Sequence, residues 1–150
     1  ESFGDRVEFA AIGNPPLLIE GASVRHFGVI QEEYKMADLY AACDLVLFPS
    51  LIEMCPLTVL ESMACGTPVV SFKNGGAEDI ITDRVDGRLI EAGDSEALVR
   101  AAEDFISMSP ENKNIIRKAA RHTVETRFDI VDCARTYLRL FQQTLEGDNV

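Results

Sequence analysis

The chain has 150 residues, a formal net charge of −11 and 47% hydrophobic residues. This length suits one domain with its own core, and the composition is that of an ordinary globular protein. The negative charge argues against a nucleic-acid partner, which would require a basic face, and no apolar run reaches the roughly 18 residues of a membrane span.

Short apolar runs alternate with helical patterns along the chain. The runs predict strands at Val7–Ile12, Val24–Phe27, Asp44–Phe48, Pro68–Phe72 and Gly87–Ile90, the first buried and the third covered on both faces. Helical spacing predicts helices over Glu33–Cys43, Pro56–Cys65, Glu111–Arg127 and Ile130–Leu145, and a further helix that Asp94 caps, with the apolar face Leu98, Ala101, Ala102 and Phe105. Such alternation predicts an α/β domain with a mostly parallel sheet and a helical C-terminal tail.

Three unusual features follow predicted strands. Glu53 follows the Asp44 strand, Gly75 and Gly76 follow the Pro68 strand in a loop that we expect to be flexible, and Gly28 follows the Val24 strand. Ligands of parallel α/β sheets bind beyond the carboxyl ends of the strands, so we expect a ligand here. The two glycines either let that ligand approach closely or make a tight turn.

The helix predicted from Pro56 has little charge. Pro56 suits its first position, and Thr58, Glu61 and Ser62 share one edge. A buried Glu61 carboxylate would need a partner, either a ligand hydroxyl or a group of the core. The helix start is an anion site, and Glu53 either faces a ligand or stabilises that start.

Cysteine and histidine spacing indicates no metal centre. Four cysteines form no C-x-x-C pair and both histidines lie far from any ligand cluster, so we expect no metal and free thiols in a reducing cytoplasm. Cys55 has no activating base in view and is interpreted as a packing residue.

The following segments, in this order and spacing, resemble a known family: VRHFGVI, ADLYAACDLVLFPS, E-x7-E from Glu53 to Glu61, SMACGTPVVSF, NGGAEDII and DGRLI. The resemblance is to the C-terminal, Rossmann-like nucleotide-sugar-binding domain of retaining GT-B fold glycosyltransferases of glycosyltransferase family four. It implies that residues 1–150 form one such domain, a fragment of a two-domain enzyme, as a chain that begins with Glu1 also suggests.

The resemblance implies roles for individual residues. Glu53 would be the catalytic carboxylate beside the donor sugar, and Glu61 would bind the ribose hydroxyls. The amides of Leu57 and Thr58 would bind the diphosphate, and the backbone near Ile30 would lie against the base. Cys55, Gly75 and Gly76 complete the predicted donor-binding residues.

Two departures from the family pattern affect this picture. Glu53-Met54-Cys55-Pro56 stands where the family has E-G-F-G or E-S-F-G, and Pro56 has no N–H to offer the donor sugar. The family's basic pair on the diphosphate, its acceptor-binding domain and the first strand of this domain would all lie upstream of Glu1. The resemblance therefore implies that the chain alone is inactive.

The implied activity is that of a hexosyltransferase. It would transfer a sugar, without a cofactor or metal, from a nucleoside diphosphate to a saccharide or lipid-linked acceptor in polysaccharide or glycan biosynthesis. We expect a cytoplasmic location, with peripheral membrane association through the missing parts alone. The alternatives are a non-catalytic nucleotide-binding or association module of the same fold, or a GT-B nucleotide-sugar epimerase. A dinucleotide dehydrogenase is disfavoured because no G-x-G-x-x-G follows a strand.

The missing strand would lie between the Val7 and Asp44 strands in the fold that the chain resembles. Buried backbone groups without partners are costly, and exposed strand edges invite pairing. We therefore expect that the two strands pair directly or that another segment fills the vacancy. A second copy of the chain could supply that segment, by oligomer formation or strand exchange.

Overall fold

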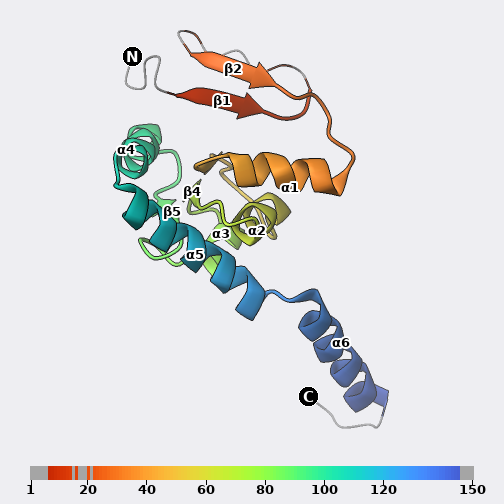
Figure 1. Cartoon of the computed structure of the whole chain (residues 1–150). Helices are drawn as coiled ribbons and strands as arrows, with labels where there is room; N and C mark the ends of the chain where they lie inside the picture. The colour runs from red at the N-terminus through yellow and green to blue at the C-terminus, as the bar shows by residue number, and fades with distance from the viewer. Residues whose placement is uncertain (1–6, 15, 17–19, 21, 146–150) are drawn as a thin grey trace.

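The structure, a computed structural model, describes residues 7–14, 16, 20 and 22–145. Its strands are β1 (Glu8–Ala11), β2 (Ser23–His26), β3 (Val46–Phe48), β4 (Val69–Phe72) and β5 (Arg88–Ile90). Its helices are α1 (Glu33–Ala42), α2 (Leu57–Ala64), α3 (Gly76–Ile80), α4 (Ser95–Ile106), α5 (Pro110–Arg127) and α6 (Ile130–Leu145) (Figure 1). The predicted α/β class, with parallel strands and a helical tail, is confirmed.

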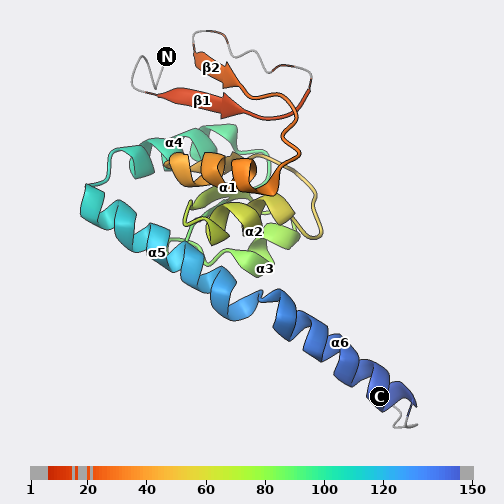
Figure 2. The ribbon, with the colours of Figure 1, turned by 45° about the vertical axis from the view of Figure 1, so that its right-hand side comes forward.

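The strands form two separate parallel sheets. One has the order β3-β4-β5, with Val46 opposite Val69 and Phe72 opposite Ile90, and the other pairs β1 with β2. In Figures 1 and 2 the β1–β2 ribbon stands apart from the larger sheet, next to α1 and α4.

The expected direct pairing of the Val7 and Asp44 strands is wrong. In the part of the chain that the structure describes, β1 pairs with β2 and β3 pairs with β4, and the two sheets remain separate. β1 is also not buried, because its residues alternate between exposed and half-buried, and β3 is half-buried rather than covered on both faces. Among the described residues, β1 and β3 each lie at the edge of their sheet and pair with a single neighbouring strand. That another segment, or a second copy of the chain, fills the position of the missing strand stays a prediction.

The core is built around β4, all four residues of which are buried. One face of the larger sheet packs against α2, α3 and α5 through Val59, Met63, Val69, Ala77, Ile80, Ile81 and Ala120. The other face packs against α4 through Val70, Phe72, Ile90, Leu98 and Ala101. The predicted apolar face of α4 is confirmed, and so is its cap, since the Asp94 carboxylate accepts a hydrogen bond from the Ala97 amide at 2.8 Å.

The start of α2 and the presence of α3 differ from the sequence prediction. Pro56 is the N-cap of α2 and not its first helical residue. Helix α3, which has five residues and begins at Gly76, was not predicted. Both starts lie at the carboxyl edge of the larger sheet, where loop contacts decide the local structure.

Two arginines of α5 form hydrogen bonds with the C-terminal ends of α1 and α3. The Arg117 guanidinium donates to the carbonyls of Cys43 (2.9 Å) and Ala41 (3.3 Å) at the end of α1. The Arg127 guanidinium donates to the carbonyls of Asp79 (2.6 Å) and Ile80 (3.3 Å) at the end of α3. Cationic side chains at helix C-termini satisfy carbonyls that the helix leaves without partners and complement the helix dipole.

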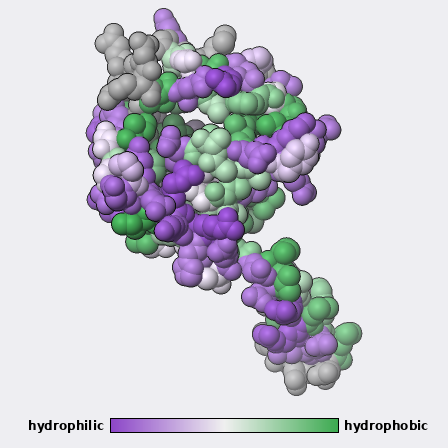
Figure 3. Space-filling model, viewed as in Figure 1, coloured by the Kyte–Doolittle hydropathy of each residue, from purple (hydrophilic) through white to green (hydrophobic). Residues whose placement is uncertain are grey.

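Helix α6 leaves the body of the protein, and none of its residues is buried (Figures 1 and 2). Its exposed apolar side chains show as green patches along the projecting segment in Figure 3 and include Ile130, Tyr137, Leu138, Phe141 and Leu145. Among the described helices, none combines the length and the apolar content that a membrane span requires.

Candidate functional site

The loops that follow β3 and β4 lie together at the carboxyl edge of the larger sheet. The Glu53 amide donates to the Asn74 carbonyl at 3.1 Å, and the Gly76 amide donates to the Glu53 carbonyl at 2.8 Å. The Asn74 side-chain amide donates to the Ser50 carbonyl at 3.2 Å. Glu53 also forms an isolated parallel bridge with Gly75. The prediction that Glu53 and the two glycines share this edge is therefore confirmed, whereas Gly28 follows β2 in the other sheet.

The loop of Asn74, Gly75 and Gly76 is held by hydrogen bonds, contrary to the expected flexible loop. The Asn74 side-chain oxygen accepts from the Ala77 amide at 3.0 Å, and the Glu78 carboxylate accepts from the Gly75 amide at 3.0 Å. Gly75 has a φ of +95°, a conformation that favours glycine. Gly75 is exposed, whereas Gly76 is buried.

The backbone of the neighbouring loop explains why residue 76 is glycine. A Cβ atom added to Gly76 would lie 2.5 Å from the Met54 carbonyl oxygen and 2.7 Å from the Pro56 Cδ atom. The missing side chain thus lets the start of α3 pack directly against the segment that leads into α2.

The start of α2 presents two exposed amides. Leu57 and Thr58 are exposed, and neither backbone N–H donates to another group within the described residues. Pro56, at the N-cap, is buried and makes no side-chain cap. Unsatisfied N–H groups and the positive end of the helix dipole favour an anion at such a position.

Glu61 lies one turn further along α2. It is exposed, so the expectation of a buried carboxylate is wrong, because the edge of α2 that carries Thr58 and Glu61 faces solvent. The partner that the sequence did not identify is Tyr40 of α1, whose hydroxyl donates to Glu61 Oε2 at 3.3 Å. Ser62, the third polar residue of that predicted edge, is buried and donates to the Thr67 carbonyl at 2.8 Å.

The other predicted residues are placed as follows. Glu53 is half-buried, and its carboxylate accepts a hydrogen bond from the Met54 amide at 3.0 Å. Cys55 is exposed, so its interpretation as a packing residue is wrong. Ile30 is half-buried between β2 and α1, and no hydrogen bond in the described part of the chain joins it to the other predicted residues.

Lys73 is the cation nearest to this loop in sequence, and it is already paired. Its ammonium donates to the Glu91 carboxylate, and this hydrogen bond and the negative charge of Glu91 raise the pKa of Lys73. Among the described residues, no group of three or more His, Cys, Asp or Glu side chains is arranged to hold a metal ion.

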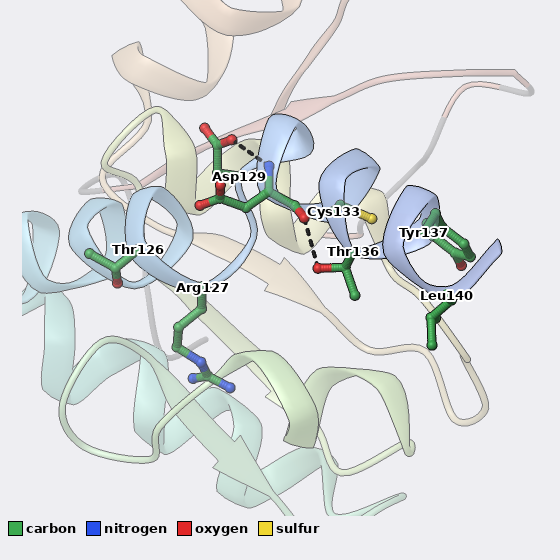
Figure 4. A pocket seen from close by; sticks show the side chains of 8 residues that line it. Thr126, Arg127, Asp129, Cys133, Thr136, Tyr137 and Leu140 are labelled. Carbon is green, nitrogen blue, oxygen red and sulfur yellow. Dashed lines mark hydrogen bonds between the residues drawn. The ribbon is translucent and has the colours of Figure 1, made fainter. Parts of the chain in front are cut away.

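A hollow of about 440 Å³ lies elsewhere, between the end of α5 and the start of α6 (Figure 4). Several of its polar groups bond within the chain: the Asp129 carboxylate accepts from the Val131 and Asp132 amides, and the Thr136 hydroxyl donates to the Asp132 carbonyl. The hollow lies where α6 leaves the body, and none of the predicted site residues lines it.

Comparison with known proteins identifies the family. The sequence profile of the glycosyl transferases group 1 matches residues 18–122. The chain belongs to this family. The match includes α1, α2 and the loops after β3 and β4, so the resemblance to the C-terminal domain of GT-B glycosyltransferases is confirmed.

Individual proteins resemble this group 1 domain in sequence or in structure. A D-inositol 3-phosphate glycosyltransferase of Streptosporangium roseum is 38% identical over 74 residues, which are 49% of this chain and 17% of the relative. The structure of sucrose-phosphate synthase from Thermosynechococcus elongatus matches with a TM-score of 0.77 at 29% identity, over 83% of this chain and 31% of that one. Anabaena Alr3699/HepE in complex with UDP-glucose matches with a TM-score of 0.71 at 29% identity, over 80% and 32%. The group 1 domain thus spans between about a sixth and a third of these proteins.

Proposed function

We propose that this chain is the donor-binding part of a glycosyltransferase that moves a sugar from a nucleoside diphosphate to a saccharide or lipid-linked acceptor, with retention. One observation carries the proposal: the free N-terminus of α2 lies between Glu53 and Glu61, beside the joined loops after β3 and β4. A diphosphate suits this helix start because the exposed amides and the helix dipole both favour negative charge. Support comes from the Anabaena relative, whose structure contains UDP-glucose.

Each predicted residue has a role in this proposal. The Leu57 and Thr58 amides hold the diphosphate and stabilise it as it leaves, a form of electrostatic catalysis. Glu61 accepts hydrogen bonds from the ribose hydroxyls, and Glu53 lies by the donor sugar. The segment at Ile30 contacts the base.

Further donor contacts come from Cys55, Gly75 and Gly76 beside the helix start. Pro56 contributes no N–H, so the sugar contact that the family makes at this position is absent here. The remaining parts of the enzyme, namely the acceptor site and a basic pair for the diphosphate, would come from a longer polypeptide. We infer a single domain over residues 1–150, a cytoplasmic location and a role in polysaccharide or glycan biosynthesis, with neither cofactor nor metal.

Isothermal titration tests the proposed site. We expect at least one of UDP, GDP and ADP to bind, and Glu61→Gln to weaken that binding by roughly 1–3 kcal/mol, because a charged hydrogen-bond acceptor is lost. Glu125→Gln is the matched control, since Glu125 is an exposed carboxylate on α5 that pairs with Arg121. If Glu61→Gln and the wild-type protein bound the nucleotide with equal affinity, Glu61 would not be part of the binding site.

Cysteine labelling provides a second test. Burial raises the pKa of the Cys43 and Cys65 thiols, whereas Cys55 and Cys133 are exposed. Because the thiolate is the reactive form, iodoacetamide at pH 8 should label Cys55 and Cys133 first. A saturating nucleoside diphosphate should slow the labelling of Cys55 and leave that of Cys133, on α6, unchanged, as peptide mass spectrometry would show. Equal labelling rates of Cys55 with and without nucleotide would place the diphosphate elsewhere.

A further inference from the structure

Tyr40 is a buried tyrosine whose hydroxyl points at a predicted ligand-binding residue. Its side chain lies in α1 and is 6% exposed, whereas Tyr34 on the same helix is 65% exposed. A buried phenol hydroxyl requires a hydrogen-bond partner. The partner here is not a core group but the exposed carboxylate of Glu61, at 3.3 Å from Oε2.

The position of Tyr40 is set by the core and does not depend on a ligand. Its backbone carbonyl accepts a hydrogen bond of 2.6 Å from the hydroxyl of Thr67, which is fully buried. The Thr67 carbonyl in turn accepts from Ser62 of α2 at 2.8 Å. α1 and α2 are therefore joined through buried side chains, and the tyrosine ring projects from this junction toward the carboxylate.

The protonation of Tyr40 favours donation to Glu61. Burial of the ring and then the negative charge of Glu61 raise the pKa of Tyr40, while a hydrogen bond from the Thr58 side chain lowers it. The hydroxyl therefore keeps its proton at neutral pH and donates a hydrogen bond to the carboxylate. Oε1 of Glu61 accepts no hydrogen bond from the residues that the structure describes, so this oxygen is open to a ligand.

We propose that Tyr40 is a positioning residue that fixes the Glu61 carboxylate, so that its open oxygen faces the ribose hydroxyls of a nucleoside diphosphate. This inference rests on the proposed function. A free glutamate side chain loses considerable rotamer entropy when it binds a ligand. Tyr40 removes part of that loss in advance, and restraint of this kind increases affinity without adding a contact to the ligand.

The test is a titration series with two ligands. The first is whichever of UDP, GDP and ADP binds most tightly, and the second is its 2′,3′-dideoxy derivative, which has no ribose hydroxyls. We expect Tyr40→Phe to weaken binding of the first ligand about fivefold, the effect of one lost hydrogen bond, and to leave the second unchanged. In a Glu61→Gln background, Tyr40→Phe should cause no further loss. Tyr34→Phe is the control and should match wild type.

Several outcomes would overturn the inference. An equal loss for both ligands, or the same loss in the Glu61→Gln background, would mean that Tyr40 acts on the fold alone. Binding that falls in Glu61→Gln but not in Tyr40→Phe would overturn this inference and leave the proposed function intact. If none of the three nucleotides bound to the wild-type protein, both this inference and the proposed function would be overturned. Within each variant, the affinity for the nucleotide is divided by the affinity for its dideoxy derivative. This ratio tests the role of Tyr40 even if Tyr40→Phe is partly destabilised.

Discussion

Replacing Gly76 by alanine is expected to lower the free energy of unfolding by roughly 3 kcal/mol, the upper part of the range for overpacking. The added Cβ would meet the Met54 carbonyl oxygen at 2.5 Å. A carbonyl cannot rotate away as a side chain can, so the segment that leads into α2 would have to move. We also expect weaker nucleoside diphosphate binding, because this segment positions the Leu57 and Thr58 amides. Urea denaturation measures the first effect and calorimetric titration the second.

Gly93→Ala is the control for this variant. Gly93 lies between β5 and α4 with a φ of +85°, and a Cβ there would meet no atom within 4 Å. The substitution therefore costs only the backbone strain of about 1 kcal/mol and should leave nucleotide affinity unchanged. If the two variants lost equal stability, the close approach of Gly76 to Met54 would not matter.

Removing the Asp86 carboxylate should destabilise the protein by about 3 kcal/mol, because two donors lose a charged acceptor. Asp86 is 1% exposed and lies between α3 and β5. Its carboxylate accepts from the Thr82 amide at 2.7 Å and from the Thr123 hydroxyl of α5 at 2.6 Å. The expected result for Asp86→Ala is a clearly lower urea midpoint.

Two further variants sharpen the Asp86 prediction. Asp104→Ala removes an exposed carboxylate of α4 and should change stability by no more than about 0.5 kcal/mol. Thr123→Val removes one of the two bonds to Asp86, and its effect should add less than fully to that of Asp86→Ala, because the two residues share one interaction. Full additivity would contradict the bond between α5 and Asp86.

The elements that could be predicted from the sequence are those whose signal is local. β4 is a continuous apolar run and is wholly buried, and the apolar face of α4 follows helical spacing. α3 has five residues, too few for a helical period to be visible, and its start depends on contact with Met54. Its absence from the prediction therefore reflects contacts between loops and not an unusual composition.

In the candidate site, too, only the features with a local sequence signal could be predicted. Glu53 and Glu61 are recognisable by their spacing and by the helix between them. The exposure of Glu61 and its bond to Tyr40, 21 residues away, depend on how α1 packs on α2. The separation of β1 from β3 is likewise a question of which strands become neighbours in space, and apolar runs carry no information about that choice.

The two arginines of α5 have a consequence for motion. Arg117 and Arg127 donate to main-chain carbonyls at the ends of α1 and α3, so hydrogen bonds link α5 to both of these helices. α2 packs against all three helices, so a shift of α2 along its axis would disrupt that packing. We therefore expect any rearrangement on ligand binding in the loops at 50–56 and 73–75 or in the β1–β2 unit, with little movement of α2 itself.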